Sequence, residues 1–206
     1  MRSGVDTFSE RNEMKLHVLG IAAVLLLLGC GETMYTGKVD NTPYAIQECV
    51  NKLSRGTEVD HDAKIDKIVV YKKKRVMYAY KDGKVVEKFR ISLGKNGDKG
   101  DKIKAGDYRT PEGSYCIVRK KCDPRLYKSL MISYPNEEDK ARARKMGVNP
   151  GGSITIHGQP KWNADGQGDA YTLSRDWTEG CMAVPNLAMD KLWRAVENGV
   201  KIEIHA

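Results

Sequence analysis

Two short pairs of residues in this sequence have the side-chain types that thiol chemistry needs. Gly158 follows His157, and Gly180 precedes Cys181. A cysteine nucleophile needs a base within hydrogen-bond reach to become a thiolate, and it needs nearby backbone N–H groups to stabilise an oxyanion. His157 can supply the base, and the amides of Gly180 and Cys181 are candidate oxyanion donors. These residues are the minimum set for a nucleophilic cysteine at Cys181; the alternative is that this cysteine is a small buried hydrophobic side chain.

The other histidines are poor candidates for the base. His17 lies in an apolar leader, His61 sits among acidic residues, and His205 is next to the last residue. His157 instead ends a β-branched segment and precedes an irregular polar stretch, where a cleft can form. His157 is therefore the predicted partner of Cys181.

Short β-branched runs separated by turns dominate the second part of the chain. Strands are predicted over residues 68–71, 75–80, 85–93, 114–118, 130–134, 153–156 and 200–204. The pair Asp82 and Gly83 predicts a hairpin turn between the second and third of these. Residues 94–113 contain five glycines and no apolar period, which predicts a long loop.

Short helices are predicted at three places. Residues 44–53 have apolar side chains at helical spacing, and residues 137–146 carry acids first and bases last before Gly147. A third helix is predicted over 186–197, with Asn186 as its cap and Gly199 as its stop. The side chains of this helix predicted to point inward are Leu187, Met189, Leu192, Trp193 and Val196. These elements predict a mainly β domain with short helices.

Three segments carry a resemblance to a known family. They are IHG at 156–158, TEGC at 178–181, and SLGKNGDKGDKIKAGDYRTPEGSYCI at 92–117. Together they resemble the L,D-transpeptidase catalytic domain (YkuD family), over residues 67–206. The resemblance implies a single β-sandwich domain of that family.

The resemblance implies a reaction on peptidoglycan tetrapeptide stems. By this analogy Cys181 attacks the carbonyl of the L-centre of meso-diaminopimelate, and the terminal D-alanine leaves. His157 takes the thiol proton while the carbonyl of Gly158 orients its ring, and the thioester passes to an amine or to water. Neither a metal nor an organic cofactor is required.

The sequence departs from the usual family pattern on both sides of the cysteine. Glu179 stands where many members have His, and Ala183 stands where many have Arg, a bidentate partner for carboxylates. The stretch DWTEGCMAVPN instead resembles a subgroup that includes amidases acting on a lipoprotein linked to diaminopimelate. A hydrolase, either a carboxypeptidase or an amidase, is therefore an alternative to a transpeptidase. Two further alternatives are a non-catalytic wall-binding module and a thiol redox protein based on Cys116 and Cys122.

Five residues are candidates for binding the substrate. They are Tyr108, Arg109, Arg175, Trp177 and Thr178. Arg175 is expected to accept a stem-peptide carboxylate. The alternative is that Trp177 packs beneath the cysteine loop and that Arg175 forms a solvated pair with Asp176.

Residues 1–29 are predicted to be a signal segment of the lipoprotein type, with translation starting at Met14. The apolar run over 18–28 has 11 residues, fewer than the roughly 20 that span a bilayer. It leads into LLGC, which resembles a lipobox and makes Cys30 the predicted lipidation site. The alternative is a buried hydrophobic helix that ends at Gly29.

The signal segment implies an organisation and a location for the rest of the chain. Residues 30–42 are predicted to be a tether, 43–66 an N-terminal helical segment, and 67–206 the catalytic domain. Gly31 follows the cysteine, which in the enterobacterial lipoproteins that this segment resembles permits transport to the outer membrane. The expected location is the periplasm of a Gram-negative bacterium, with a lipid anchor in the outer membrane. Expected partners are stem peptides and an anchored lipoprotein.

Net charge and cysteine content limit the other possibilities. The chain has 35 basic and 27 acidic residues, a formal charge of +8. The basic clusters at 72–75 and 119–121 are predicted to be solvated sheet edges, and no nucleic-acid recognition motif accompanies them, so nucleic acid is not an expected partner. Export permits disulfides. Cys116 is close enough to pair with Cys122, and Cys49 is an alternative partner for either.

Overall fold

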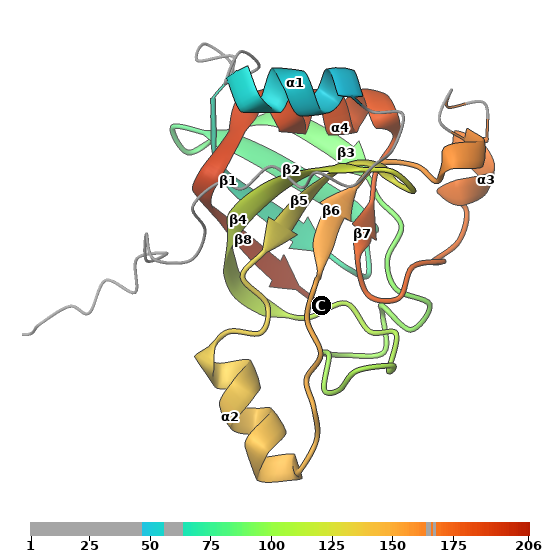
Figure 1. Cartoon of the computed structure of the whole chain (residues 1–206). Coiled ribbons are helices and arrows are strands. Elements are labelled where there is room, and N and C mark those ends of the chain that lie inside the picture. The colour runs from blue at the N-terminus through green and yellow to red at the C-terminus, as the bar shows by residue number, and fades with distance from the viewer. Residues whose placement is uncertain (1–46, 56–63, 164–165, 167) are drawn as a thin grey trace, which may run out of the picture.

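The computed structural model describes residues 47–55, 64–163, 166 and 168–206. The predicted signal segment, the tether and Cys30 lie outside the described residues. The described chain forms a curled β-sheet with short helices at its ends (Figure 1). No helix in this described part is both long enough and apolar enough to cross a membrane.

Eight strands form the sheet. They are β1 (Ile65–Tyr71), β2 (Val76–Lys81), β3 (Lys84–Arg90), β4 (Gly113–Asp123), β5 (Tyr127–Ile132), β6 (Thr155–His157), β7 (Met182–Ala183) and β8 (Val196–His205). Their order in the sheet is β3-β2-β1-β8-β4-β5-β6-β7. A bridge between Ser92, just after β3, and Ala183 in β7 joins the two ends of this order, so the sheet curls on itself. The prediction of a mainly β fold is confirmed, and the sandwich is one curled sheet whose halves face each other.

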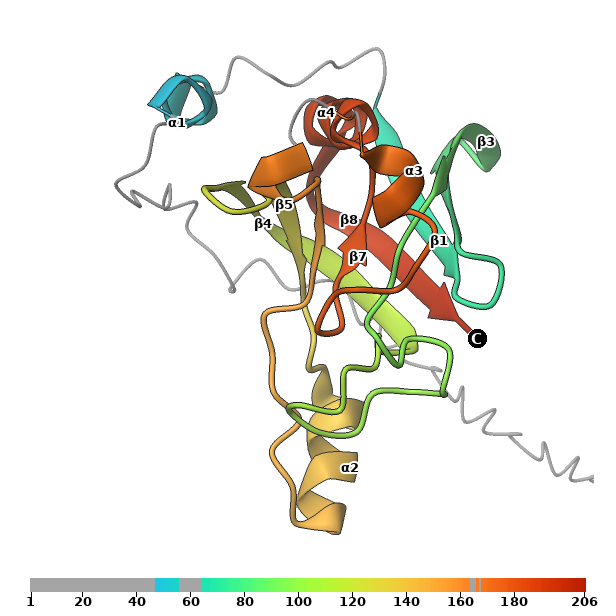
Figure 2. The ribbon, with the colours of Figure 1, turned by 90° about the vertical axis from the view of Figure 1, so that its right-hand side faces the viewer.

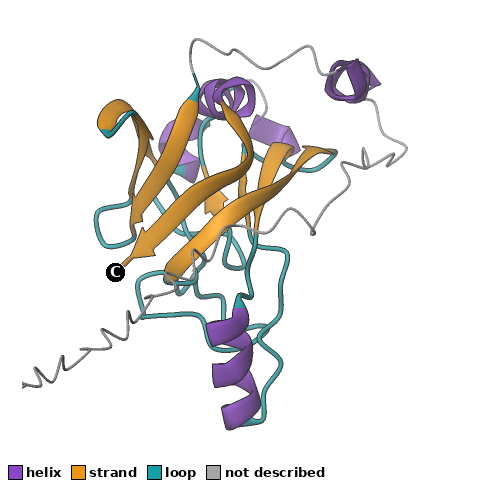
Figure 3. Cartoon of the chain, turned by 90° about the vertical axis from the view of Figure 1, so that its left-hand side faces the viewer, coloured by secondary structure: helices purple, strands orange, loops and turns teal. Residues whose placement is uncertain are grey.

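The helices lie at the ends of this sheet (Figure 3). They are α1 (Gln47–Arg55), α2 (Glu137–Met146), the 3-10 turn η2 (Lys161–Asn163), α3 (Asp169–Thr172) and α4 (Asn186–Ala195). Helix α2 begins and ends as predicted, because Asn136 caps its first turn and Gly147 takes a left-handed conformation at its end. It lies at the opposite end of the sheet from α1 and α4 (Figure 1).

Predictions for the last helix were partly wrong. The helix ends at Ala195 rather than at residue 197, because Val196 already belongs to β8. Gly199 lies within β8, and Asn186 is the first helical residue rather than the cap. Leu187 does not point inward, since it is 81% exposed.

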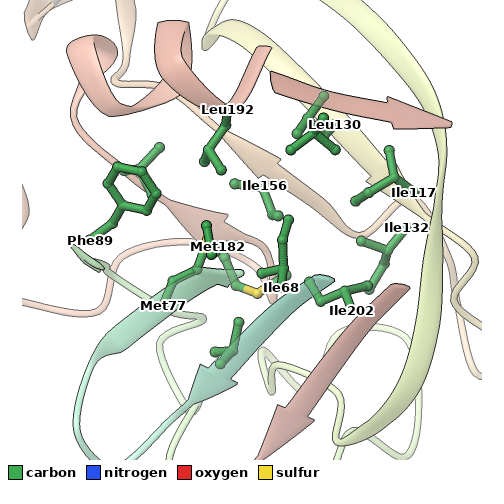
Figure 4. Close-up of a cluster of buried hydrophobic side chains, with 14 of the residues drawn as sticks. Ile68, Met77, Phe89, Ile117, Leu130, Ile132, Ile156, Met182, Leu192 and Ile202 are labelled. Carbon is green, nitrogen blue, oxygen red and sulfur yellow. The ribbon is translucent and has the colours of Figure 1, made fainter. Parts of the chain in front are cut away.

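Apolar side chains from both halves of the sheet fill the space between them (Figure 4). The labelled members are Ile68, Met77, Phe89, Ile117, Leu130, Ile132, Ile156, Met182, Leu192 and Ile202. Trp193 of α4 is fully buried in the same cluster. The alternation predicted for the last strand is confirmed, because Val200, Ile202 and Ile204 are all buried.

The strand β4 is longer than predicted. It continues to Asp123 and forms an antiparallel hairpin with β5, so Cys122 lies in a strand and not in a loop. Cys122 forms a disulfide with Cys49 of α1. The pairing of Cys122 with Cys116 was therefore wrong, and the alternative, Cys49 as the partner, is confirmed for Cys122. The Cys116–Cys122 dithiol on which the redox hypothesis rested is absent from the described residues.

One lysine of the first basic cluster is buried, contrary to the prediction of a solvated edge. Lys72 is 1% exposed, and its ammonium donates to Gly100 O and Thr110 O at 2.8 Å each and to Glu112 Oε1 at 2.9 Å. These three acceptors belong to the loop between β3 and β4. Lys72, which directly follows β1, therefore holds this loop against the end of β1.

Replacing Lys72 by methionine is expected to lower the free energy of unfolding by about 2 kcal/mol, because two carbonyls and a carboxylate lose their donor. Thermal denaturation of the variant would measure this loss. Lys73→Met is the matched control, since Lys73 is exposed and a surface change costs within about 0.5 kcal/mol. Equal stability of the two variants would contradict the assigned role of Lys72.

Candidate active site

Strand pairing brings the two predicted catalytic residues together. β6 and β7 are parallel, with Ile156 opposite Met182 and His157 opposite Ala183. Cys181 precedes β7 directly, so it lies at the level of Thr155, whose hydroxyl is 3.6 Å from Cys181 Sγ. The side chains of Thr155 and His157 share one face of β6, because alternate residues of a strand do so.

The ring of His157 is buried and held in one orientation. It is 1% exposed, and its Nδ1 lies 2.8 Å from the carbonyl oxygen of Gly158. Because a carbonyl oxygen only accepts, Nδ1 carries a proton, and Nε2 is the ring nitrogen that can take the proton of the thiol. Trp177 packs edge-to-face against the ring, with centroids 5.6 Å apart. The free nitrogen is thus available to the thiol.

Cys181 is the free cysteine of the described residues. Burial acts to raise the pKa of its thiol, but hydrogen bonding to His157, the charge of His157 and a hydrogen bond from Thr155 lower the pKa below the usual value. A lowered pKa increases the thiolate fraction near neutral pH. The arrangement is that of an activated thiol nucleophile.

The turn before Cys181 is closed by Thr178. The Thr178 hydroxyl donates to Cys181 O at 2.8 Å and accepts from the Gly180 amide at 3.1 Å. Gly180 has φ 130°, and a Cβ at this position would lie 2.8 Å from Arg109 O, so only glycine fits. Because the Gly180 amide is already bonded to Thr178, the amide of Cys181 is the better candidate for the oxyanion donor.

Replacing Thr178 by valine is expected to lower kcat/KM about tenfold to a hundredfold, because the turn loses both bonds and the thiol loses its position. Steady-state kinetics on a stem peptide would measure this loss. Thr178→Ser keeps the hydroxyl and is expected to retain most of the activity. Full activity of Thr178→Val would show that the two hydrogen bonds of the Thr178 hydroxyl do not position Cys181.

A cavity of about 620 Å³ opens beside Cys181. Its lining includes five of the predicted site residues, namely Tyr108, His157, Trp177, Thr178 and Cys181. The rest of the lining is Lys102, Ala105, Gly106, Arg125, Leu126, Gly151, Gly152, Ser153, Ile154 and Glu179. Figure 2 shows the loop between β3 and β4 beside the segment before β7, where Gly94 bridges Thr178.

Two predicted substrate-binding residues lie elsewhere. Arg109 is not in the cavity lining, and its guanidinium donates to Asp101 O at 3.2 Å. Arg175 is also absent from the lining and stacks on the ring of Tyr171 at 3.6 Å. The alternative pairing of Arg175 with Asp176 was wrong, because Asp176 accepts from Arg75 at 2.9 and 3.0 Å.

A buried polar network behind His157 was missed from the sequence. Asn186 Oδ1 accepts from the Gln159 amide at 2.7 Å, and Gln159 Nε2 donates to Val184 O at 2.9 Å. Gln159 is fully buried, and a Cβ on Gly158 would lie 2.4 Å from Asn186 Oδ1. The network fixes the backbone whose carbonyl holds the His157 ring. No local pattern marks it, because its members come from separate segments.

Within the part of the chain that the structure describes, no group of three or more His, Cys, Asp or Glu side chains is placed to hold a metal ion.

The family model of the L,D-transpeptidase catalytic domain (YkuD) matches residues 65–204, from the first residue of β1 to the last but one of β8. The chain belongs to this family.

Two known proteins match part of the chain. YafK of Escherichia coli (strain K12) is 30% identical over 103 residues, which are 49% of this chain and 33% of YafK. The crystal structure of the helical cell shape determining protein Pgp2 from Campylobacter jejuni matches with 29% identity and a TM-score of 0.51. That match covers 68% of this chain and 47% of Pgp2. The chain thus spans less than half the length of either relative over these matches.

Proposed function

We propose that this protein is an exported cysteine L,D-transpeptidase that acts on peptidoglycan tetrapeptide stems. The observation that carries the proposal is a free thiol, Cys181, with a lowered pKa beside the oriented ring of His157, on the wall of a cavity of about 620 Å³. The family supports peptidoglycan as the material on which the enzyme acts.

The reaction proceeds in two acyl transfers. The Cys181 thiolate attacks the carbonyl carbon at the L-centre of meso-diaminopimelate, the C–N bond to D-alanine breaks, and His157 protonates the leaving amine. An amine of a second stem then attacks the thioester carbonyl and gives its proton to His157. The C–S bond breaks, so that a new amide forms and the Cys181 thiol is released. His157 can serve both steps because the Gly158 carbonyl holds Nδ1 and leaves Nε2 facing the reaction.

A hydrolase on the same bonds is the second candidate function. Water replaces the amine in the second step, which makes the enzyme an L,D-carboxypeptidase or an amidase that releases a peptidoglycan-linked lipoprotein. The observation that favours it is Ala183, which is fully buried between β6 and Ser92. That position contributes no basic group to the wall beside Cys181, so substrate choice can differ from that of members with arginine there.

Mass spectrometry of purified muropeptides incubated with the protein tests these functions. Loss of D-alanine with new diaminopimelate dimers supports the transpeptidase, whereas loss without dimers supports the carboxypeptidase. Release of a linked lipoprotein supports the amidase. Unchanged muropeptides with retained binding to cell walls would contradict catalysis and support the non-catalytic module.

The location and biological role are part of the proposal. A lipid anchor at Cys30 places the enzyme in the periplasm at the outer membrane, and similarity to Pgp2 supports a role in cell wall remodelling and cell shape. Labelling cells with an alkyne fatty acid should mark the wild-type chain but not Cys30→Ser. A peptide map that finds Cys30 in a disulfide would contradict the anchor.

A further inference from the structure

The cavity beside Cys181 is lined by two charged side chains that have no partner among the described residues. They are Arg125 and Glu179, and neither makes a side-chain hydrogen bond or ion pair with any described residue. The third charged residue of the lining, Lys102, is already neutralised, because its ammonium lies 2.7 Å from Asp107 Oδ1 and it is only 3% exposed. Lys102 also helps to lower the pKa of Asp107, which burial alone would raise, to about 2.

Arg125 is presented by a rigid turn between β4 and β5. Asp123 Oδ1 accepts from the amides of Arg125 at 2.9 Å and Leu126 at 3.1 Å, and Arg125 O accepts from the Lys161 amide at 3.0 Å. Cys122, the residue before Asp123 in β4, is bound to α1 by its disulfide with Cys49. The backbone of this arginine is thus held before any ligand arrives, which lowers the entropy cost of binding.

Glu179 is presented by the catalytic turn itself. It lies between Thr178 and Gly180, in the turn that the Thr178 hydroxyl closes onto Cys181. Its side chain is exposed at the cavity. One unpaired cation and one unpaired anion therefore face the same space beside the nucleophile, each supplied by a fixed turn.

We propose that Arg125 and Glu179 form a recognition site for a zwitterionic amino acid group, in which a free carboxylate sits next to a free ammonium. The guanidinium of Arg125 binds the carboxylate through two parallel N–H donors, and Glu179 accepts from the ammonium. A group of only one charge leaves one of the two protein charges without a partner.

This inference rests on the proposed function for the identity of the ligand. When Cys181 attacks the L-centre of meso-diaminopimelate, the far end of the same residue is its D-centre, which carries a free carboxylate and a free ammonium. Recognition of that end selects stems whose D-centre is neither amidated nor acylated, and it rejects stems with lysine, which lacks the carboxylate. The two charges thus determine which donor stem the enzyme accepts.

Binding of synthetic tetrapeptide stems to the Cys181→Ala protein tests the site without requiring turnover. Isothermal titration calorimetry should give about tenfold weaker binding when the D-centre carboxylate is amidated or when lysine replaces diaminopimelate. Arg125→Gln should weaken binding of the free-carboxylate stem by the same factor, and it should bind the amidated stem no worse than the parent protein does. Glu179→Gln should weaken binding of the stem with a free D-centre amine by this factor. It should bind a stem whose D-centre amine is acetylated no worse than the parent protein does.

Matched controls keep general charge effects apart from recognition. Arg144→Gln and Glu138→Gln remove exposed charges on α2 and should leave discrimination between the stems unchanged. If Arg125→Gln still discriminates between free and amidated carboxylates as the parent does, the proposed site is wrong. If discrimination depends on Arg125 but the wild-type protein turns over no stem, the recognition site stands and the proposed acyl transfer fails.

Discussion

Replacing Cys181 by alanine is expected to lower turnover of tetrapeptide stems by at least about 10⁴-fold, because the acyl-enzyme can no longer form. Intact-protein mass spectrometry should show a stem-peptide adduct on the wild-type protein and none on Cys181→Ala. Cavity binding does not need the thiol, so the variant should still bind the substrate.

The Cys181→Ala variant is expected to stay folded, so that a loss of turnover can be assigned to the missing thiol. Besides its hydrogen bond with His157, Cys181 Sγ makes long contacts, at 3.6 Å to Thr155 Oγ1 and 3.7 Å to Ser153 O. The free energy of unfolding of Cys181→Ala should therefore stay within about 1 kcal/mol of the wild-type value. Retained turnover in a folded Cys181→Ala protein would place the nucleophile elsewhere and overturn the assigned mechanism.

Replacing His157 by glutamine is expected to lower kcat by about 10² to 10⁴-fold, because glutamine cannot take the thiol proton or return it to the leaving amine. The pKa of the Cys181 thiol should also change. Hydrogen bonding and charge from His157 offset the burial that raises the pKa of Cys181. Without His157 the pKa rises, so less thiolate is present at a given pH. The pH profile of iodoacetamide alkylation should move to higher pH in the variant.

Thr155→Val is the comparison for this result. The Thr155 hydroxyl also lowers the pKa of Cys181, but it does so less than His157 and from 3.6 Å. Its removal should shift the alkylation profile in the same direction and by less, with a smaller loss of kcat. An unchanged profile in His157→Gln would mean that another group activates the thiol.

The sequence alone determined the type of fold and singled out the candidate catalytic pair. Alternating and β-branched runs identified most strands, and the Asp82–Gly83 pair identified the β2–β3 hairpin, because these patterns reflect contacts between near neighbours in the chain. The pair His157 and Cys181 was visible because Gly158 and Gly180 flank them in short motifs. Local features of this kind need no knowledge of distant partners.

Only the tertiary structure decided which side chains share a space. Cys122 pairs with Cys49, 73 residues away, and Lys72 is buried because acceptors 28 to 40 residues downstream surround its ammonium. Arg175 was the expected carboxylate partner because it lies between His157 and Cys181 in the sequence, yet Arg125 from the distant β4–β5 turn lines the cavity. Side-chain neighbours of this kind depend on how the sheet curls, and sequence spacing carries no information on that.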